Sequence, residues 1–114
     1  MSVKINRREM GEVTVVELSG KLVLGDASAQ LRQTLRELID AGKKKIVLNL
    51  GQVGYIDSSG LGELVSGFTT VKNQGGQLKL ANLTDKVNDL LTVTKLYTVF
   101  EIHTNESSAV QSFS

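Results

Sequence analysis

The sequence predicts an α/β domain in which helices cover a β-sheet with parallel central strands. Three observations support this fold class. After an opening pair of extended segments, apolar residues recur alternately with strand spacing and helix spacing. The nearly continuous apolar run at 46–50 is typical of a central strand covered on both faces. The chain has 114 residues, which is the size of one ordinary domain.

The first part of the chain contains the extended segments. Residues 3–8 alternate weakly and predict an edge strand, and Gly11 predicts a turn after it. Residues 13–18 are rich in β-branched side chains and predict a second strand. Because a short extended piece at 21–24 follows Gly20, we expect a hairpin there.

A first helix is predicted after these strands. Asp26 or Ser28 can act as its N-cap, and Gly42 lies where a helix should end. Its inner face shows the 3–4 spacing of apolar residues: Ala27, Leu31, Leu35, Leu38 and Ile39. The lysines at 43–45 are expected to form a solvated loop that leads into the central strand.

The second part of the chain continues the alternation. Residues 77–81 and 98–103 predict two further strands. One helix is expected to end near Gly75 and Gly76, one to be capped by Thr84, and one to be capped by Asn105. The apolar residues expected on the inner faces of these three helices are Leu61, Leu64, Val65, Phe68 and Val71, then Val87, Leu90 and Leu91, then Ala109, Val110 and Phe113.

Composition restricts the chemistry. Thirteen basic residues nearly balance twelve acidic ones, whereas a nucleic-acid-binding protein usually has a clear basic excess. The absence of cysteine excludes disulfides, thiolate nucleophiles and cysteine-ligated zinc. No stretch approaches the ~20 apolar residues of a membrane span, and the N-terminus has no apolar run of signal-peptide length. We expect a cytoplasmic protein with no metal and no cofactor that binds neither nucleic acid nor membrane.

The segment D-S-S-G-L-G at 57–62 is the main candidate for a functional site. Its aspartate and both serines are good N-cap residues, so a helix start alone could account for them. Capping needs only one side chain, however, so at least one hydroxyl should be free and exposed. Gly60 and Gly62 both fall in the first turn, where each weakens a helix. Close approach of another backbone or molecule is a common physical reason for such glycines.

An exposed serine here could be a nucleophile, an anion ligand or a phosphate acceptor. A catalytic serine needs a base, and the single histidine, His103, lies in the last predicted strand. A lysine or carboxylate could replace it, but no spacing indicates one. The segment is not a G-x-S-x-G elbow, and the chain has no glycine motif typical of nucleotide binding. Asp57 would also repel a phosphate-bearing ligand. We therefore predict no catalytic residue and no enzyme activity.

The phosphate-acceptor interpretation fits the residues best. Phosphorylation adds about −1.5 to −2 charges. A helix N-terminus tolerates this charge because its free N–H groups and dipole are directed at it. A partner docked over Gly60 and Gly62 would instead have to accommodate a dianion beside Asp57. The residues thus predict a binding switch with Ser58 as its control point.

The same segment, preceded by the apolar strand at 46–50, resembles the STAS domain of bacterial anti-sigma factor antagonists. The stretch G-G-Q-L-K-L-A-N-L at 75–83 is also similar to this family. Three residues in the closing part of the chain share the likeness: Leu96, Phe100 and Ala109. The resemblance spans essentially the whole chain, 1–114, as one domain. It implies a mixed sheet flanked by about four helices.

What the resemblance implies is a partner switch in stress-responsive control of transcription. Family members bind an anti-sigma factor that is also a serine kinase of the histidine-kinase-like ATPase type, and this binding frees the sigma factor. The kinase phosphorylates the first serine of the motif, here Ser58, and the antagonist then dissociates. A PP2C-type phosphatase resets the switch. The matching docking positions are Asp57, Ser58, Ser59, Gly60, Leu61 and Gly62.

One departure from the family concerns the loop after the second strand. Family members often have Gly-x-Leu/Ile-Asp there, whereas this chain has G-K-L-V-L-G-D at 20–26, so its acidic residue comes later. Two alternative functions are also compatible with the resemblance. One is a signalling module in a stressosome-like or other scaffold without a sigma factor downstream. The other is an enzyme or small-ligand carrier, since lipid-transport systems contain relatives of this domain.

Overall fold

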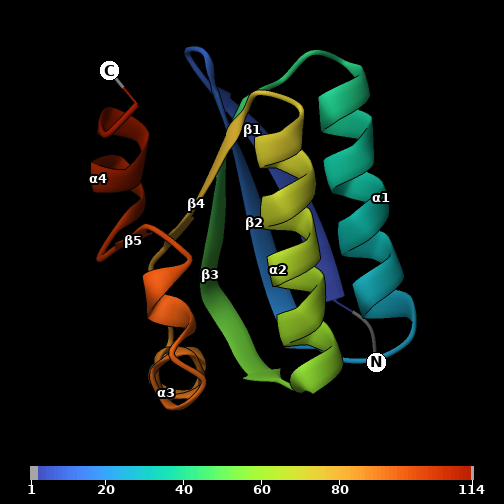
Figure 1. Cartoon of the computed structure of the whole chain (residues 1–114), viewed down its shortest axis with the longest axis vertical. Helices are drawn as coiled ribbons and strands as arrows, with labels where there is room; N and C mark the ends of the chain where they lie inside the picture. Colours follow the sequence, from blue (N-terminus) through green and yellow to red (C-terminus); the bar gives the residue numbers. More distant parts are fainter. Residues whose placement is uncertain (1–2, 114) are drawn as a thin grey trace.

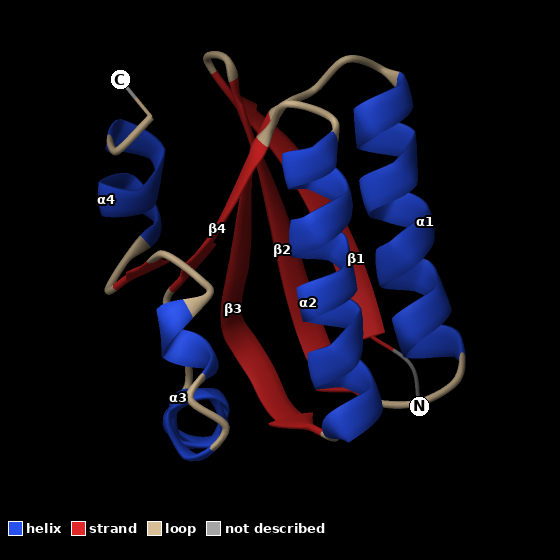
Figure 2. Ribbon diagram, viewed as in Figure 1, coloured by secondary structure: helices blue, strands red, loops and turns tan. Residues whose placement is uncertain are grey.

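The computed structural model describes residues 3–113, and its five strands form one mixed sheet in the order β1-β2-β3-β4-β5 (Figures 1 and 2). The strands are β1 (Val3–Met10), β2 (Val13–Leu22), β3 (Lys45–Ile56), β4 (Gln77–Ala81) and β5 (Ile102–His103). β1 pairs antiparallel with β2, and the other neighbours are parallel. The helices are α1 (Asp26–Asp40), α2 (Ser58–Asn73), α3 (Asp85–Val93) and α4 (Glu106–Gln111), with a 3₁₀-helix, η1 (Leu96–Thr98). The predicted mixed α/β architecture is confirmed.

The sheet has an apolar core on each face. α1 and α2 lie side by side over one face (Figure 1) and, with α3, enclose the larger cluster, to which Ile46 and Leu48 belong. α4 covers the other face, where the smaller cluster includes Val47 and Ala109. Because successive side chains of a strand point to opposite faces, the run at 46–50 is buried from both sides. The prediction of a covered central strand is confirmed.

Most predicted helix faces and caps are also confirmed. The hydroxyl of Thr84 accepts the N–H of Val87, and the side chain of Asn105 accepts the N–H of Ser108. Gly42 follows the end of α1 with a left-handed φ of 80°. Some residues of the predicted inner faces are only partly buried and pack at the margin of the cores: Ile39, Val65, Phe68, Leu90, Val110 and Phe113.

The predicted hairpin at Gly20 is wrong. This glycine lies inside β2, which continues to Leu22 with an irregular register against β3. The strand continues because its parallel pairing extends to the pair formed by Leu22 and Ile56. For the same reason β3 continues past Leu50 to Ile56. The tight turn lies instead at Gly11, as predicted, where φ is 67°.

Two further boundaries differ from prediction. Neither Asp26 nor Ser28 caps α1, because Gly25 holds the N-cap position and the Ser28 hydroxyl donates to the carbonyl of Val23 at 3.1 Å. The last strand is limited to Ile102–His103. The preceding residues instead form η1 and a turn, which bring the buried ring of Phe100 edge-on to Phe68 at 5.4 Å between centroids. The residues before Ile102 therefore place an aromatic ring in the core instead of pairing as a strand.

Polar contacts fasten both ends of α4 to the sheet. Two guanidinium nitrogens of Arg8 donate to the carboxylate of Glu106 at 2.8 and 2.7 Å, and the buried amide of Asn49 donates to it at 2.9 Å. At the other end the Nζ of Lys79 donates to the Oγ of Ser112 at 2.7 Å. The position of α4 on the second face of the sheet therefore depends on charged hydrogen bonds as well as on apolar packing.

This arrangement predicts an acid-sensitive contribution to stability. The hydrogen bonds from Arg8, more than the one from Asn49, hold the pKa of Glu106 below its usual range, although burial opposes them. Because the folded-state pKa is lowered, the stabilisation is present above the ordinary glutamate pKa of about 4 and is lost as the pH falls through the folded value. We expect Glu106→Gln to flatten the acid limb of a urea-stability profile measured from pH 7 to pH 3. Glu12→Gln on the exposed β1–β2 turn is the control, and equal flattening in both variants would contradict the prediction.

Candidate functional site

The segment 57–62 connects the end of β3 to the start of α2. α1 and α2 both begin at this end of the sheet, where β2 and β3 finish (Figure 1). In open sheets with parallel strands, ligands and partners meet the loops at the carboxyl ends of the strands. The topology therefore places the candidate segment on the part of the fold that most often carries function.

Asp57 is the N-cap of α2 and also fastens the neighbouring loop. Its Oδ1 accepts the N–H of Gly60 at 2.8 Å, and its Oδ2 accepts the N–H of Leu24 at 3.1 Å. Both hydrogen bonds lower the pKa of the Asp57 carboxyl, and the one from Gly60 has the larger effect. The site thus contains a fixed negative charge that joins the start of α2 to the β2–α1 loop. The sequence left three candidate caps, and the structure assigns the role to Asp57.

Ser58 is the first residue of α2, and its side chain is exposed. Within residues 3–113 its hydroxyl makes no hydrogen bond, because the cap is made by Asp57. Ser59 is half-buried. The hydroxyl of Ser58 is therefore accessible to a second protein, and its removal takes no bond from the fold.

The two glycines of the segment have different surroundings. A Cβ on Gly60 would overlap the carbonyl oxygen of Leu22 and lie 2.9 Å from its carbonyl carbon. Close approach of another backbone is therefore the reason for Gly60, and that backbone is β2 of the same chain. A Cβ on Gly62 would meet nothing within 4 Å, so this residue leaves open surface. Gly60 and Leu61 are buried, and the segment presents Asp57, Ser58, Ser59 and Gly62 to solvent.

Two apolar side chains beside the segment were not identified from the sequence. Leu24 is 76% exposed although its backbone N–H is held by Asp57, and Tyr55 is 45% exposed. An exposed side chain on a fixed backbone is a suitable contact for a partner because little conformational entropy is lost on docking. Leu24 belongs to an apolar run, Leu22-Val23-Leu24, and nothing in that run indicates which member faces outward.

His103 is engaged elsewhere. Its Nε2 lies 2.6 Å from the Glu101 carboxylate and its Nδ1 lies 3.0 Å from the Ser108 hydroxyl, so it makes no contact with Ser58. Among residues 3–113 no three His, Cys, Asp or Glu side chains are grouped so that they could hold a metal ion. In the same part of the chain no helix is both long enough and apolar enough to span a bilayer.

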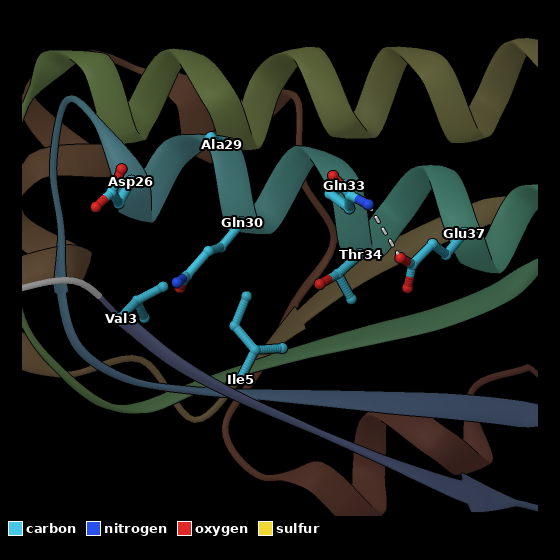
Figure 3. A pocket seen from close by; sticks show the side chains of 8 residues that line it. All are labelled: Val3, Ile5, Asp26, Ala29, Gln30, Gln33, Thr34 and Glu37. Carbon is cyan, nitrogen blue, oxygen red and sulfur yellow. Dashed lines mark hydrogen bonds between the residues drawn. The ribbon is translucent and has the colours of Figure 1, made fainter.

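A separate open groove of about 490 Å³ lies between β1 and α1 (Figure 3). The side chains of Val3 and Ile5 come from the strand, and those of Gln30 and Thr34 from the helix. Its polar groups are neutral or acidic and are spread along α1. The groove contains none of the residues 57–62, so it is not part of the candidate site.

Fold and site together define a class: a small mixed-sheet α/β domain with an exposed serine where the central parallel strand passes into a helix. Residues 4–109 match the model of the STAS domain, and the chain belongs to this family. The predicted family resemblance is confirmed.

Three similar proteins make the relationship concrete. The anti-sigma-B factor antagonist of Bacillus subtilis is 32% identical over 111 residues, which are 97% of this chain and 100% of that protein. The anti-sigma F factor antagonist of Paenibacillus polymyxa is 29% identical over 96% of this chain and 94% of its own length. The crystal structure of a candidate anti-sigma factor antagonist from Thermotoga maritima superposes with a TM-score of 0.87 at 25% identity, covering 95% of this chain and 92% of the other.

Proposed function

We propose that the protein is an anti-sigma factor antagonist whose docking surface surrounds Ser58 and whose binding is switched off by phosphorylation of that residue. The observation that carries the proposal is the exposed Ser58 hydroxyl, which has no hydrogen-bond partner within residues 3–113. The relatives named as antagonists of anti-sigma factors, aligned over nearly the whole chain, support it. The whole chain, 1–114, is taken as one STAS domain that acts in the cytoplasm and catalyses no reaction.

The electrostatics of the site suit such a switch. The N–H of Gly60, which could have neutralised a phosphate at the start of α2, already donates to Asp57. A phosphate on Ser58 would therefore add charge next to an existing carboxylate, while water still solvates it in the free domain. A docked partner would remove that water and leave the charges uncompensated. The domain should stay folded and the complex should dissociate.

The partner in this proposal is an anti-sigma factor that is a serine kinase of the histidine-kinase-like ATPase type. A PP2C-type phosphatase removes the phosphate. The residues proposed to touch the kinase are the solvent-accessible members of the segment, Asp57, Ser58, Ser59 and Gly62, and the buried Gly60 and Leu61 support them from below. Leu24 and Tyr55 are added as flanking apolar contacts.

A phosphorylation assay tests the proposal. The purified chain is incubated with ATP, Mg²⁺ and each kinase of this type encoded in the same genome, and phosphate is located by peptide mass spectrometry. We expect one phosphate on Ser58, its absence in Ser58→Ala, and its retention in Ser59→Ala, which removes the adjacent hydroxyl. Phosphate on another residue in the unsubstituted chain would overturn the proposal.

A further inference from the structure

An exposed tyrosine lies between two lysines at the end of the sheet that leads to Ser58. In the register of β2 and β3, Lys21 is opposite Tyr55 and Leu22 is opposite Ile56. Registered residues of neighbouring strands point to the same face, and successive residues point to opposite faces. Since Leu22 and Ile56 are buried in the main core, Lys21 and Tyr55 project from the other face, into solvent.

The second lysine comes from α3. The Nζ of Lys86 lies 5.6 Å from the centroid of the Tyr55 ring, within the range of a cation–π contact. The first turn of α3 is fixed at this place because the Thr84 hydroxyl donates to the carbonyl of Val53 at 3.0 Å. Lys21, Tyr55 and Lys86 are called the Tyr55 patch below.

Many basic side chains of the chain form ion pairs with carboxylates, but the two lysines of the patch form none within residues 3–113. Arg7, Arg8, Arg32, Lys43, Lys45 and Lys79 each form an ion pair. Within residues 3–113 neither Lys21 nor Lys86 has a carboxylate within ion-pair distance. The patch thus presents two unneutralised positive charges and an aromatic surface. Next to Ser58 in the chain, Asp57 is bonded to the backbone of the exposed Leu24, so this part of the surface is acidic and apolar instead.

We propose that the Tyr55 patch is a second contact for the partner that docks at Ser58, and that it receives an acidic segment of that partner. The inference rests on the proposed function and adds the chemistry of the contacting segment. Carboxylates of the segment would pair with the two ammonium groups, and its apolar atoms would cover the tyrosine ring. Because the patch is basic and Asp57 is acidic, a partner with charges complementary to both would dock in one orientation.

Charge reversal tests this inference. Calorimetric titration of the unphosphorylated double variant Lys21→Glu/Lys86→Glu is carried out with the kinase that modifies Ser58. The control is Lys4→Glu/Lys44→Glu, which makes the same change in net charge at two exposed lysines elsewhere on the surface that form no ion pair within residues 3–113. We expect about ten-fold weaker binding of the patch variant, with the difference shrinking as salt is raised, and nearly unchanged binding of the control.

The possible results separate the two proposals. If both double variants bind like the unsubstituted chain while Ser58 phosphorylation still abolishes binding, the inference is overturned and the proposed function stands. Equal weakening in both variants would show a general charge effect and would also overturn the inference. If no kinase of this type binds the unmodified chain, both proposals fail. Circular dichroism of each variant verifies that the fold is retained, as expected for substitutions at exposed side chains.

Discussion

Phosphorylation of Ser58 is expected to weaken partner binding about 1000-fold, which corresponds to ~4 kcal/mol. The physical reason is the cost of burying an uncompensated charge, which amounts to several kcal/mol when no partner group neutralises it. Asp57 raises this cost because its carboxylate is held at the same helix start. The measurement is a pair of calorimetric titrations of the kinase, one with the unmodified chain and one with the stoichiometrically phosphorylated chain.

Two variants show whether the effect belongs to this position. Ser58→Ala should bind like the unmodified chain and melt at nearly the same temperature, because the cap of α2 is Asp57. Ser66→Asp adds one charge on the exposed side of the same helix and should leave the affinity nearly unchanged, whereas Ser58→Asp should lower it. Equal affinities of the phosphorylated and unphosphorylated chains would contradict the proposed switch.

Gly60→Ala is expected to destabilise the domain by about 1–3 kcal/mol or more, the range for overpacking a filled site. The added methyl group would meet the Leu22 carbonyl and lie 3.0 Å from Cγ1 of Ile56. The first of these is backbone of a central strand, which cannot move aside as a side-chain end can. Helix propensity alone would make alanine slightly favourable here, but we expect the contact with Leu22 to outweigh that preference.

Gly62→Ala is the matched control for this second prediction. The residue lies in the same first turns of α2, its φ is not left-handed, and the added methyl group would meet nothing within 4 Å. It should leave stability unchanged or raise it by up to ~1 kcal/mol. Urea denaturation of both variants measures the difference, and equal midpoints would show that the contact between Gly60 and Leu22 is not restrictive. If Gly62→Ala keeps its stability but binds the kinase more weakly, the result would support docking over Gly62.

The sequence by itself determined the fold class and the position of the candidate site. Apolar spacing identified α1, α2 and α3 because one buried face imposes a period that is visible locally, as with Leu31, Leu35 and Leu38. The run at 46–50 identified the central strand because both of its faces are covered. An exposed serine was expected because the segment contains three residues suited to N-capping, whereas the helix needs only one of them.

The tertiary structure alone decided the ends of the elements and the function of individual residues at the site. β2 and β3 extend past Gly20 and Leu50 because they pair with each other, and pairing between distant segments leaves no local signal. Asp57 rather than Ser58 became the cap because it also bonds to Leu24, 33 residues away. For the same reason the packing of Gly60 on Leu22, and the place of Tyr55 between Lys21 and Lys86, could be recognised only in the folded chain.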